Sequence, residues 1–191
     1  MKNNRNLIVV FAIGIICIVS AVIVYAIDSG KSDETIDWDV TLVGVDGRER
    51  MISYADIKAM PSISGKGGFF TSVGVINGPF DLKGVPVTDI CDLVGGISSD
   101  EIVYLYAVDG YSAVFDYEQI TGDIDTYDIE TMKLIPHDDL RVILAYEQNG
   151  KLLSHEYGKP LRLAVIAGEN LLTEGHHWVK WIDQIEIVKL N

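Results

Sequence analysis

The sequence predicts an α+β domain with β-rich mixed sheets and short helices, preceded by one N-terminal transmembrane helix. Three observations support this prediction. An uncharged apolar run lies near the N-terminus, strand-like segments separated by Gly, Asn and Asp fill the remainder, and only short segments there carry helix signals. A chain of 191 residues is long enough for one membrane segment plus one domain that folds on its own core.

The apolar run extends over residues 7–27 and contains no charge. A helix needs about 20 apolar residues to cross a bilayer. Lys2 and Arg5 precede the run, and acidic residues follow it. Because positive charge stays on the cytoplasmic side, we expect residues 1–6 inside the cell and a single-pass anchor in the cell membrane, with the C-terminal domain extracytoplasmic. The alternative is a signal peptide cleaved near Ala26, which also exports the domain.

The region that follows the apolar run is acidic. Residues 28–37 form a short polar segment that we interpret as a tether, so the folded domain is expected over residues 38–191. The formal net charge of the chain is −13, and an acidic surface repels phosphate backbones, which excludes nucleic acid as a partner. Cys91 is the only thiol after the anchor, so no disulfide is possible within the domain.

The first strands of the domain form a pattern that occurs twice. Asp46-Gly47 separates two strand-like runs, and a short helix with Ser53 as its cap follows. Asp109-Gly110 repeats this order 63 residues later, with Asp116 as the helix cap. The sequence predicts either a reused hairpin-plus-helix unit or a chance similarity of two Asp-Gly hairpins.

The remaining segments complete the count of elements. A third short helix is predicted between Pro86 and Gly95, with Cys91 as a small buried side chain. "RVILAYEQNGKLL" predicts a strand that ends in an Asn149-Gly150 turn, and "LRLAVIA" and "QIEIVKL" predict two further strands. The glycine-rich "GKGG" lacks the Lys-Ser/Thr ending of a phosphate-binding loop.

Two motifs near the end and the middle of the chain carry a family resemblance. "GKPLRLAV" followed by "VKWIDQIEIV" is similar to a closing signature in which His-Gly-x-Pro-x-Arg leads through apolar strand to Val-Lys-Trp. "NGPFDLKGVPVTDICDLVG" is similar to the same family's segment after its metal site. In this order the motifs resemble the sulfite oxidase-type oxidoreductase molybdopterin-binding domain family, over roughly residues 38–189.

The resemblance implies a fold, a cofactor and a set of contact residues. The cofactor would be molybdopterin with molybdenum or tungsten, which performs oxygen-atom or electron transfer. Arg162 and Lys180 stand at the family's two cations and would contact the pterin phosphate. Tyr157 stands where the family has histidine. Ser72, in "TSVGV", stands where the family has the cysteine that ligates the metal.

Other functions remain open from the sequence. A fold relative without the metal would serve as an extracytoplasmic binding or scaffold module with no cofactor, and an electron-transfer or membrane protein partner is not identified by any motif. His155, Glu174, His176 and His177 could hold zinc or copper. Adjacent residues on a strand point to opposite faces, however, so histidines on a solvated surface loop are the simpler interpretation.

Overall fold

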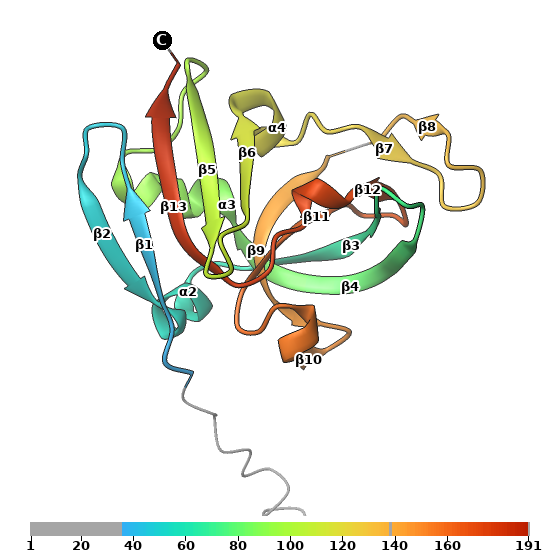
Figure 1. Cartoon of the computed structure of the whole chain (residues 1–191), viewed down its shortest axis with the longest axis horizontal. Coiled ribbons are helices and arrows are strands. Elements are labelled where there is room, and N and C mark those ends of the chain that lie inside the picture. The colour runs from blue at the N-terminus through green and yellow to red at the C-terminus, as the bar shows by residue number, and fades with distance from the viewer. Residues whose placement is uncertain (1–35, 138, 191) are drawn as a thin grey trace, which may run out of the picture. The chain divides into compact units, whose positions relative to one another are not determined.

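The computed structural model describes residues 36–137 and 139–190 (Figure 1). The predicted cytoplasmic N-terminus and transmembrane anchor, and all but the last two residues of the predicted tether, lie outside the described residues. Within the described ranges no helix is both long and apolar enough to cross a membrane. The described domain is an assembly of two sheets with short helices, as the sequence predicted.

The first sheet has five strands in the order β2-β1-β13-β5-β6. The central strand, β13, pairs in parallel with β1 and antiparallel with β5, so the last strand of the chain joins two hairpins that are far apart in sequence. The strands are β1 (Asp39–Val43), β2 (Glu49–Ser53), β5 (Glu101–Ala107), β6 (Ser112–Asp116) and β13 (Ile182–Lys189).

The two predicted hairpin-plus-helix units form the two edges of this sheet. The β1–β2 hairpin leads into α2 (Tyr54–Ala59), and the β5–β6 hairpin leads into α4 (Tyr117–Thr121). Both helices begin with a capping box, in which Ser53 or Asp116 accepts a hydrogen bond from the backbone N–H three residues later. The structure therefore contains the same local arrangement twice, which is compatible with a reused unit and with a chance similarity of two Asp-Gly hairpins.

The second sheet has eight strands, of which seven follow the order β10-β9-β4-β3-β12-β7-β8 and β11 pairs with β9. A backbone bridge between Lys66 of β3 and Ala167 after β11 closes the circuit β9-β4-β3-β11. The strands are β3 (Ile63–Phe70), β4 (Ile76–Pro86), β7 (Thr126–Tyr127), β8 (Leu134–Ile135), β9 (Arg141–Gln148), β10 (Lys151–Leu152), β11 (Arg162–Ile166) and β12 (Leu172–Glu174).

Short helical turns connect the strands of both sheets. α3 (Val87–Cys91) and the 3-10 turn η1 (Asp92–Val94) follow β4, as predicted, and the turn ends at Gly95 in a left-handed conformation. η2 (His155–Tyr157) precedes β11, and η3 (Gly175–His177) follows β12. The predicted Asn149-Gly150 turn joins β9 to β10.

Two hydrophobic clusters explain why the middle of β9 and the part of β11 after Arg162 are apolar on both faces. Val142 and Leu144 face the larger cluster, which includes side chains of both sheets, whereas Ile143 and Ala145 face a smaller one that also contains Trp178. Since successive side chains of a strand point to opposite faces, a strand buried on both faces must be apolar throughout. The smaller cluster lies beside the candidate site.

Candidate functional site

Arg162 begins β11 between two neighbouring backbone segments. It is in register with Ala145 of β9 on one side and forms a backbone bridge with Lys180 on the other. The N–H of Leu163 donates to the carbonyl oxygen of Val179 at 2.7 Å, which extends this second pairing. The side chain of Arg162 is 1% exposed, although its charge favours water.

The guanidinium of Arg162 packs beside two adjacent aromatic rings, whose centroids are 5.0 Å apart, and has unused hydrogen-bond donors. Its Cζ lies 5.6 Å from the ring centroid of Phe69 and 5.1 Å from that of Trp178. Within the described residues its Nε and Nη2 atoms have no hydrogen-bond partner. Burial lowers the pKa of Arg162 to about 10, against a smaller opposing effect of Tyr157, so the group is still charged at neutral pH. A buried charge with free donors favours a bound anion.

Lys180 and Gly158 complete the surroundings of Arg162. Residues paired directly across antiparallel strands present their side chains on the same face, so Lys180 adds a second cation beside Arg162. Gly158 ends η2 with φ of 95°, and a Cβ at this position would meet the Cβ atoms of Lys180 and Arg162 at 3.0 and 3.1 Å. Glycine thus permits both a left-handed backbone and the close approach of η2 to the two cations.

Tyr157 precedes Gly158 at the edge of the same site. Its side chain is 36% exposed, and its ring packs edge-on against Phe80 with centroids 5.9 Å apart. The structure therefore brings together three of the four residues named from the sequence: Arg162, Lys180 and Tyr157.

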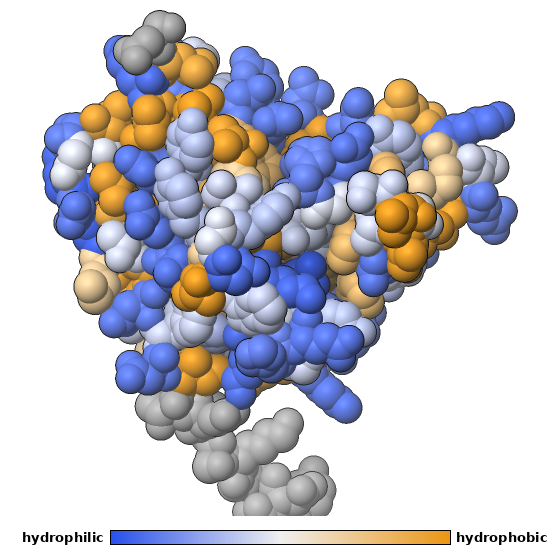
Figure 2. All heavy atoms as spheres, in the orientation of Figure 1, coloured by the Kyte–Doolittle hydropathy of each residue, from blue (hydrophilic) through white to orange (hydrophobic). Residues whose placement is uncertain are grey.

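Ser72 lies in the exposed turn between β3 and β4. The turn is held by the N–H of Thr71, which donates to the carbonyl oxygen of Val75 at 2.9 Å. In the described part of the chain no hydrogen bond or ion pair joins Ser72 to Arg162 or Lys180. Figure 2 shows hydrophobic side chains exposed on the side where this turn, β7 and β8 lie. Within the turn, Val73 is 82% exposed.

Comparison with known proteins decides the family of the chain. The model of the oxidoreductase molybdopterin binding domain matches residues 27–191. The chain belongs to this family. Its fold is similar to the structure of the sulfane dehydrogenase SoxCD from Paracoccus pantotrophus, with a TM-score of 0.60 and 19% identity, over 79% of this chain and 38% of that one. No curated protein matches at the sequence level. The chain spans well under half the length of the SoxCD chain.

Membership of the molybdopterin-binding family implies a molybdopterin cofactor, and the residues present fit one part of it. Two cations, one of them buried with two unpartnered donor nitrogens, suit the phosphate group of the pterin. The thiolate ligand of the metal has no counterpart near Ser72, since the described residues contain one cysteine, Cys91, buried in α3. Burial and, to a lesser extent, Asp92 raise the pKa of Cys91 to about 12, which keeps it protonated.

The structure corrects the interpretation of the histidines. His176 and His177 were expected in a solvated surface loop, with side chains unable to meet unless the chain turned; they lie on the turn η3, and their ring centroids are 3.8 Å apart. His177 is also not a surface residue, because it is 5% exposed. His155 packs instead against Trp181. No group of three or more His, Cys, Asp or Glu side chains among the described residues is arranged to hold a metal ion, so the histidine metal site is not supported.

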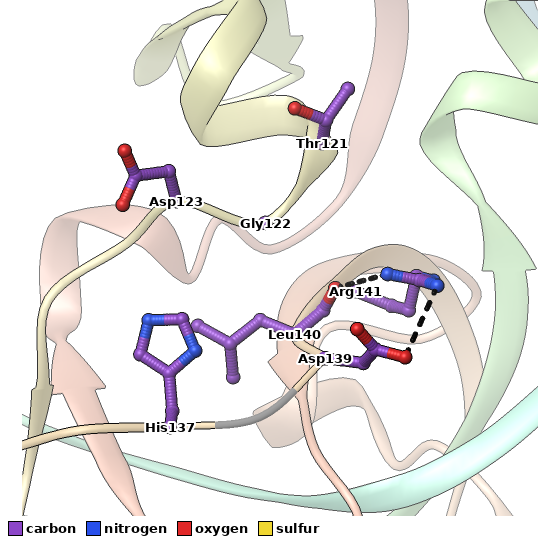
Figure 3. Close-up of a pocket in the computed structure, with 7 residues that line it drawn as sticks. All are labelled: Thr121, Gly122, Asp123, His137, Asp139, Leu140 and Arg141. Atoms are coloured by element: carbon purple, nitrogen blue, oxygen red, sulfur yellow. Dashed lines mark hydrogen bonds and ion pairs between the residues drawn. The ribbon is translucent and has the colours of Figure 1, made fainter.

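A polar pocket of about 740 Å³ lies elsewhere, between the end of α4 and the start of β9 (Figure 3). Some of the residues that line it interact with each other. Arg141 forms an ion pair with Asp139 at 3.9 Å, and its Nη1 donates to the carbonyl oxygen of Leu140 at 2.9 Å. The pocket contains neither Arg162 nor Lys180, so it is not part of the site described above.

Sequence reasoning missed the side chains that hold Arg162 in place. Phe69 and Trp178 lie next to each other against the guanidinium. The indole Nε1 of Trp178 donates to the Thr173 hydroxyl at 2.8 Å, which fixes the orientation of that ring. No motif near Arg162 points to Phe69, because Phe69 lies about 90 residues before Arg162 in the sequence. Only the pairing of the strands places it there.

Proposed function

We propose that this chain is a molybdopterin-binding oxidoreductase domain in which Arg162 and Lys180 bind the phosphate of the pterin. The observation that carries the proposal is the buried guanidinium of Arg162, whose Nε and Nη2 have no partner in the described part of the protein. Since an unpaired buried charge destabilises a fold, a binding site is the simplest reason for its presence.

The roles of the residues follow from their chemistry. Nε and Nη2 of a guanidinium lie in one plane and can donate to two oxygens of one phosphate, while Lys180 adds a compact positive charge beside them. The rings of Phe69 and Trp178 keep the guanidinium from rotating away. Gly158 lets the backbone of η2 lie close to both cations, which a side chain at this position would prevent. When bound, the cofactor would supply a molybdenum or tungsten centre that exchanges electrons or oxygen atoms with a substrate.

Ser72 and Tyr157 have smaller proposed roles. Ser72 could offer only an oxygen ligand to the metal, from an exposed position. Tyr157 lies close enough to influence the pKa of Arg162 and would lie at the edge of the bound pterin. We propose that a separate electron-transfer or membrane protein is the redox partner.

We also propose that residues 7–27 anchor the protein in the cell membrane with the domain outside. The apolar length of this run and the basic residues before it support the proposal. The measurement is proteolysis of intact spheroplasts followed by fractionation. A domain that is degraded by external protease and sediments with membranes supports the proposal, whereas a protected domain contradicts it.

The cofactor proposal is tested on full-length protein purified from its own host, because a foreign host need not insert the cofactor. Metal content is measured by mass spectrometry and pterin by the fluorescence of its oxidised form. Near one pterin per chain, with molybdenum or tungsten, is expected in the natural protein, and loss of pterin is expected in Arg162→Met. Arg141→Met, at a partly exposed arginine away from the site, is the matched control and should keep its pterin.

The opposite result has an equally clear meaning. A well-folded natural protein with neither pterin nor metal would contradict the proposal and leave a binding or scaffold module on the same fold. Pterin present equally in the Arg162→Met and control variants would contradict the assignment of Arg162.

A further inference from the structure

A second pocket, of about 440 Å³, has a lining that the proposed function does not use. It lies between α4, the segment that leads from α4 to β7, and the turn η3 after β12; these elements are labelled in Figure 1 except η3. Five carboxylates and two histidines contribute to its lining, and no lysine or arginine does: Asp116, Glu118, Asp123, Asp125, Glu174, His176 and His177.

Three of the five carboxylates have no side-chain hydrogen bond or ion pair within the described structure. Asp116 caps α4, and Glu174 accepts a hydrogen bond from the Tyr127 hydroxyl at 3.2 Å and lies 3.1 Å from Nδ1 of His176. Glu118, Asp123 and Asp125 make no side-chain hydrogen bond or ion pair with another residue of the described ranges. Like charges gathered around one hollow repel each other, and a bound cation relieves that repulsion.

His177 gives independent support, because it lines the same pocket and is buried without a polar partner. It is 5% exposed, and among the described residues neither Nδ1 nor Nε2 has a hydrogen-bond partner. Its ring packs on Phe115 and His176, with centroids 5.3 and 3.8 Å away. Burial, and secondarily His176, lower the pKa of His177 to about 4, so the imidazole is neutral at physiological pH. A neutral imidazole has one bare nitrogen that accepts a hydrogen bond.

We propose that this pocket binds an ammonium or guanidinium group, with the free carboxylates supplying charge and the neutral imidazole of His177 accepting an N–H. A bare metal ion fits less well, because no three metal-binding side chains of the described residues converge on one point. An anion is excluded by the charge of the lining. The cationic group can belong to a free amine or to a basic side chain of a protein. The proposal does not depend on the molybdopterin assignment, since the two sites share no residue.

The experiment measures binding of two probes to the full-length protein in detergent at low ionic strength, by isothermal titration calorimetry. Spermidine represents a free amine, and a capped tetralysine peptide represents a protein side chain. Saturable binding of one probe molecule per chain is expected, with an affinity that falls as salt is added. The tighter of the two probes identifies the source of the cation.

Two sets of variants locate the binding. Asp123→Asn with Asp125→Asn is expected to weaken binding about fivefold, the size typical of two exposed charges. The control, Asp37→Asn with Glu49→Gln, removes the same charge at exposed positions that do not line the pocket, and should leave the affinity unchanged. His177→Phe keeps a ring against Phe115 but removes both nitrogens, and is expected to weaken binding about fivefold or more while the protein stays folded by circular dichroism.

Three outcomes would overturn the proposal: no saturable binding of either probe, equal weakening by the control pair, or unchanged affinity in His177→Phe. His177→Gln serves as a second variant if the phenylalanine is not accommodated, because its amide keeps an acceptor and should restore part of the affinity. Pterin content is measured on the same samples, and it should not change in any of these variants.

Discussion

Replacing Arg162 with methionine tests whether the arginine is kept for a ligand or for the fold. Methionine fills a similar volume without charge and suits the apolar neighbours Phe69 and Trp178. If Arg162 is part of the scaffold, its loss should destabilise the protein by about 3–5 kcal/mol, as expected when a buried charged group is removed from its partners. If Arg162 instead serves to bind an anion, the substitution should stabilise the cofactor-free protein.

The size of that gain follows from the structure. The fall in the pKa of Arg162 to about 10 corresponds to roughly 3 kcal/mol of destabilisation of its charged form, at about 1.4 kcal/mol per pKa unit. The two aromatic contacts that methionine loses offset about 1–2 kcal/mol of this. The net expectation is that Arg162→Met raises the free energy of unfolding of the cofactor-free protein by about 1 kcal/mol, which is about 2–4 °C in Tm for a domain of this size.

The assay is urea unfolding of cofactor-free protein, followed by tryptophan fluorescence, with the cofactor-loaded protein in parallel. The loaded natural protein should be stabilised by its ligand, and the variant should lack that increment. Arg141→Met, at a half-exposed arginine with a 3.9 Å ion pair to Asp139, should change stability by less than about 0.5 kcal/mol. A loss of about 3 kcal/mol or more in cofactor-free Arg162→Met would contradict a ligand-binding role, because it would show that the guanidinium stabilises the fold without a ligand.

Three further predictions concern other parts of the domain. Gly158→Ala should lower the free energy of unfolding in urea by about 2–3 kcal/mol, because the position combines a φ of 95° with a crowded Cβ. Gly47→Ala has a φ of 77° and open space around the Cβ, so it should lower the free energy of unfolding by only about 1 kcal/mol. Equal losses in the two variants would contradict an effect of crowding at Gly158. In the folded protein the pKa of His177 is about 4, below its ordinary value, so the unfolded chain binds the proton more tightly. The free energy of unfolding should therefore fall by roughly 2–3 kcal/mol as pH drops from about 6.5 to 4. His177→Phe should flatten this part of the curve of stability against pH, and an unchanged slope in the variant would contradict the prediction. Ser53→Ala and Asp116→Ala should each destabilise the protein by about 1 kcal/mol, because each removes a helix cap. The double variant should be destabilised by the sum of the two effects, since the caps lie at opposite edges of one sheet. Thermal unfolding measures all three variants, and strong non-additivity would contradict the independence of the two units.

The sequence carries the resemblance that the family comparison confirmed, and the reason is that the motifs concerned are short and local. "GKPLRLAV" and "VKWIDQIEIV" are enough to single out Arg162 and Lys180. The burial of Arg162 could not be predicted in this way. An arginine among apolar residues is as compatible with an exposed strand end as with a pocket, and only the pairing of β11 with β9 and with Lys180 removes it from water.

Elements whose cause is local can be predicted from the sequence. Asp-Gly turns, helix caps at Ser53 and Asp116, and glycine after η1 each act over fewer than about ten residues, so the two hairpin-plus-helix units could be read directly. The tertiary structure decided everything that depends on distant partners. It placed β13 between the two units, set Phe69 against Arg162, left Ser72 on an exposed turn and buried His177 beside an acidic pocket. These outcomes follow from long-range strand pairing and from the burial it produces, and no single stretch of sequence contains both partners of such a pair.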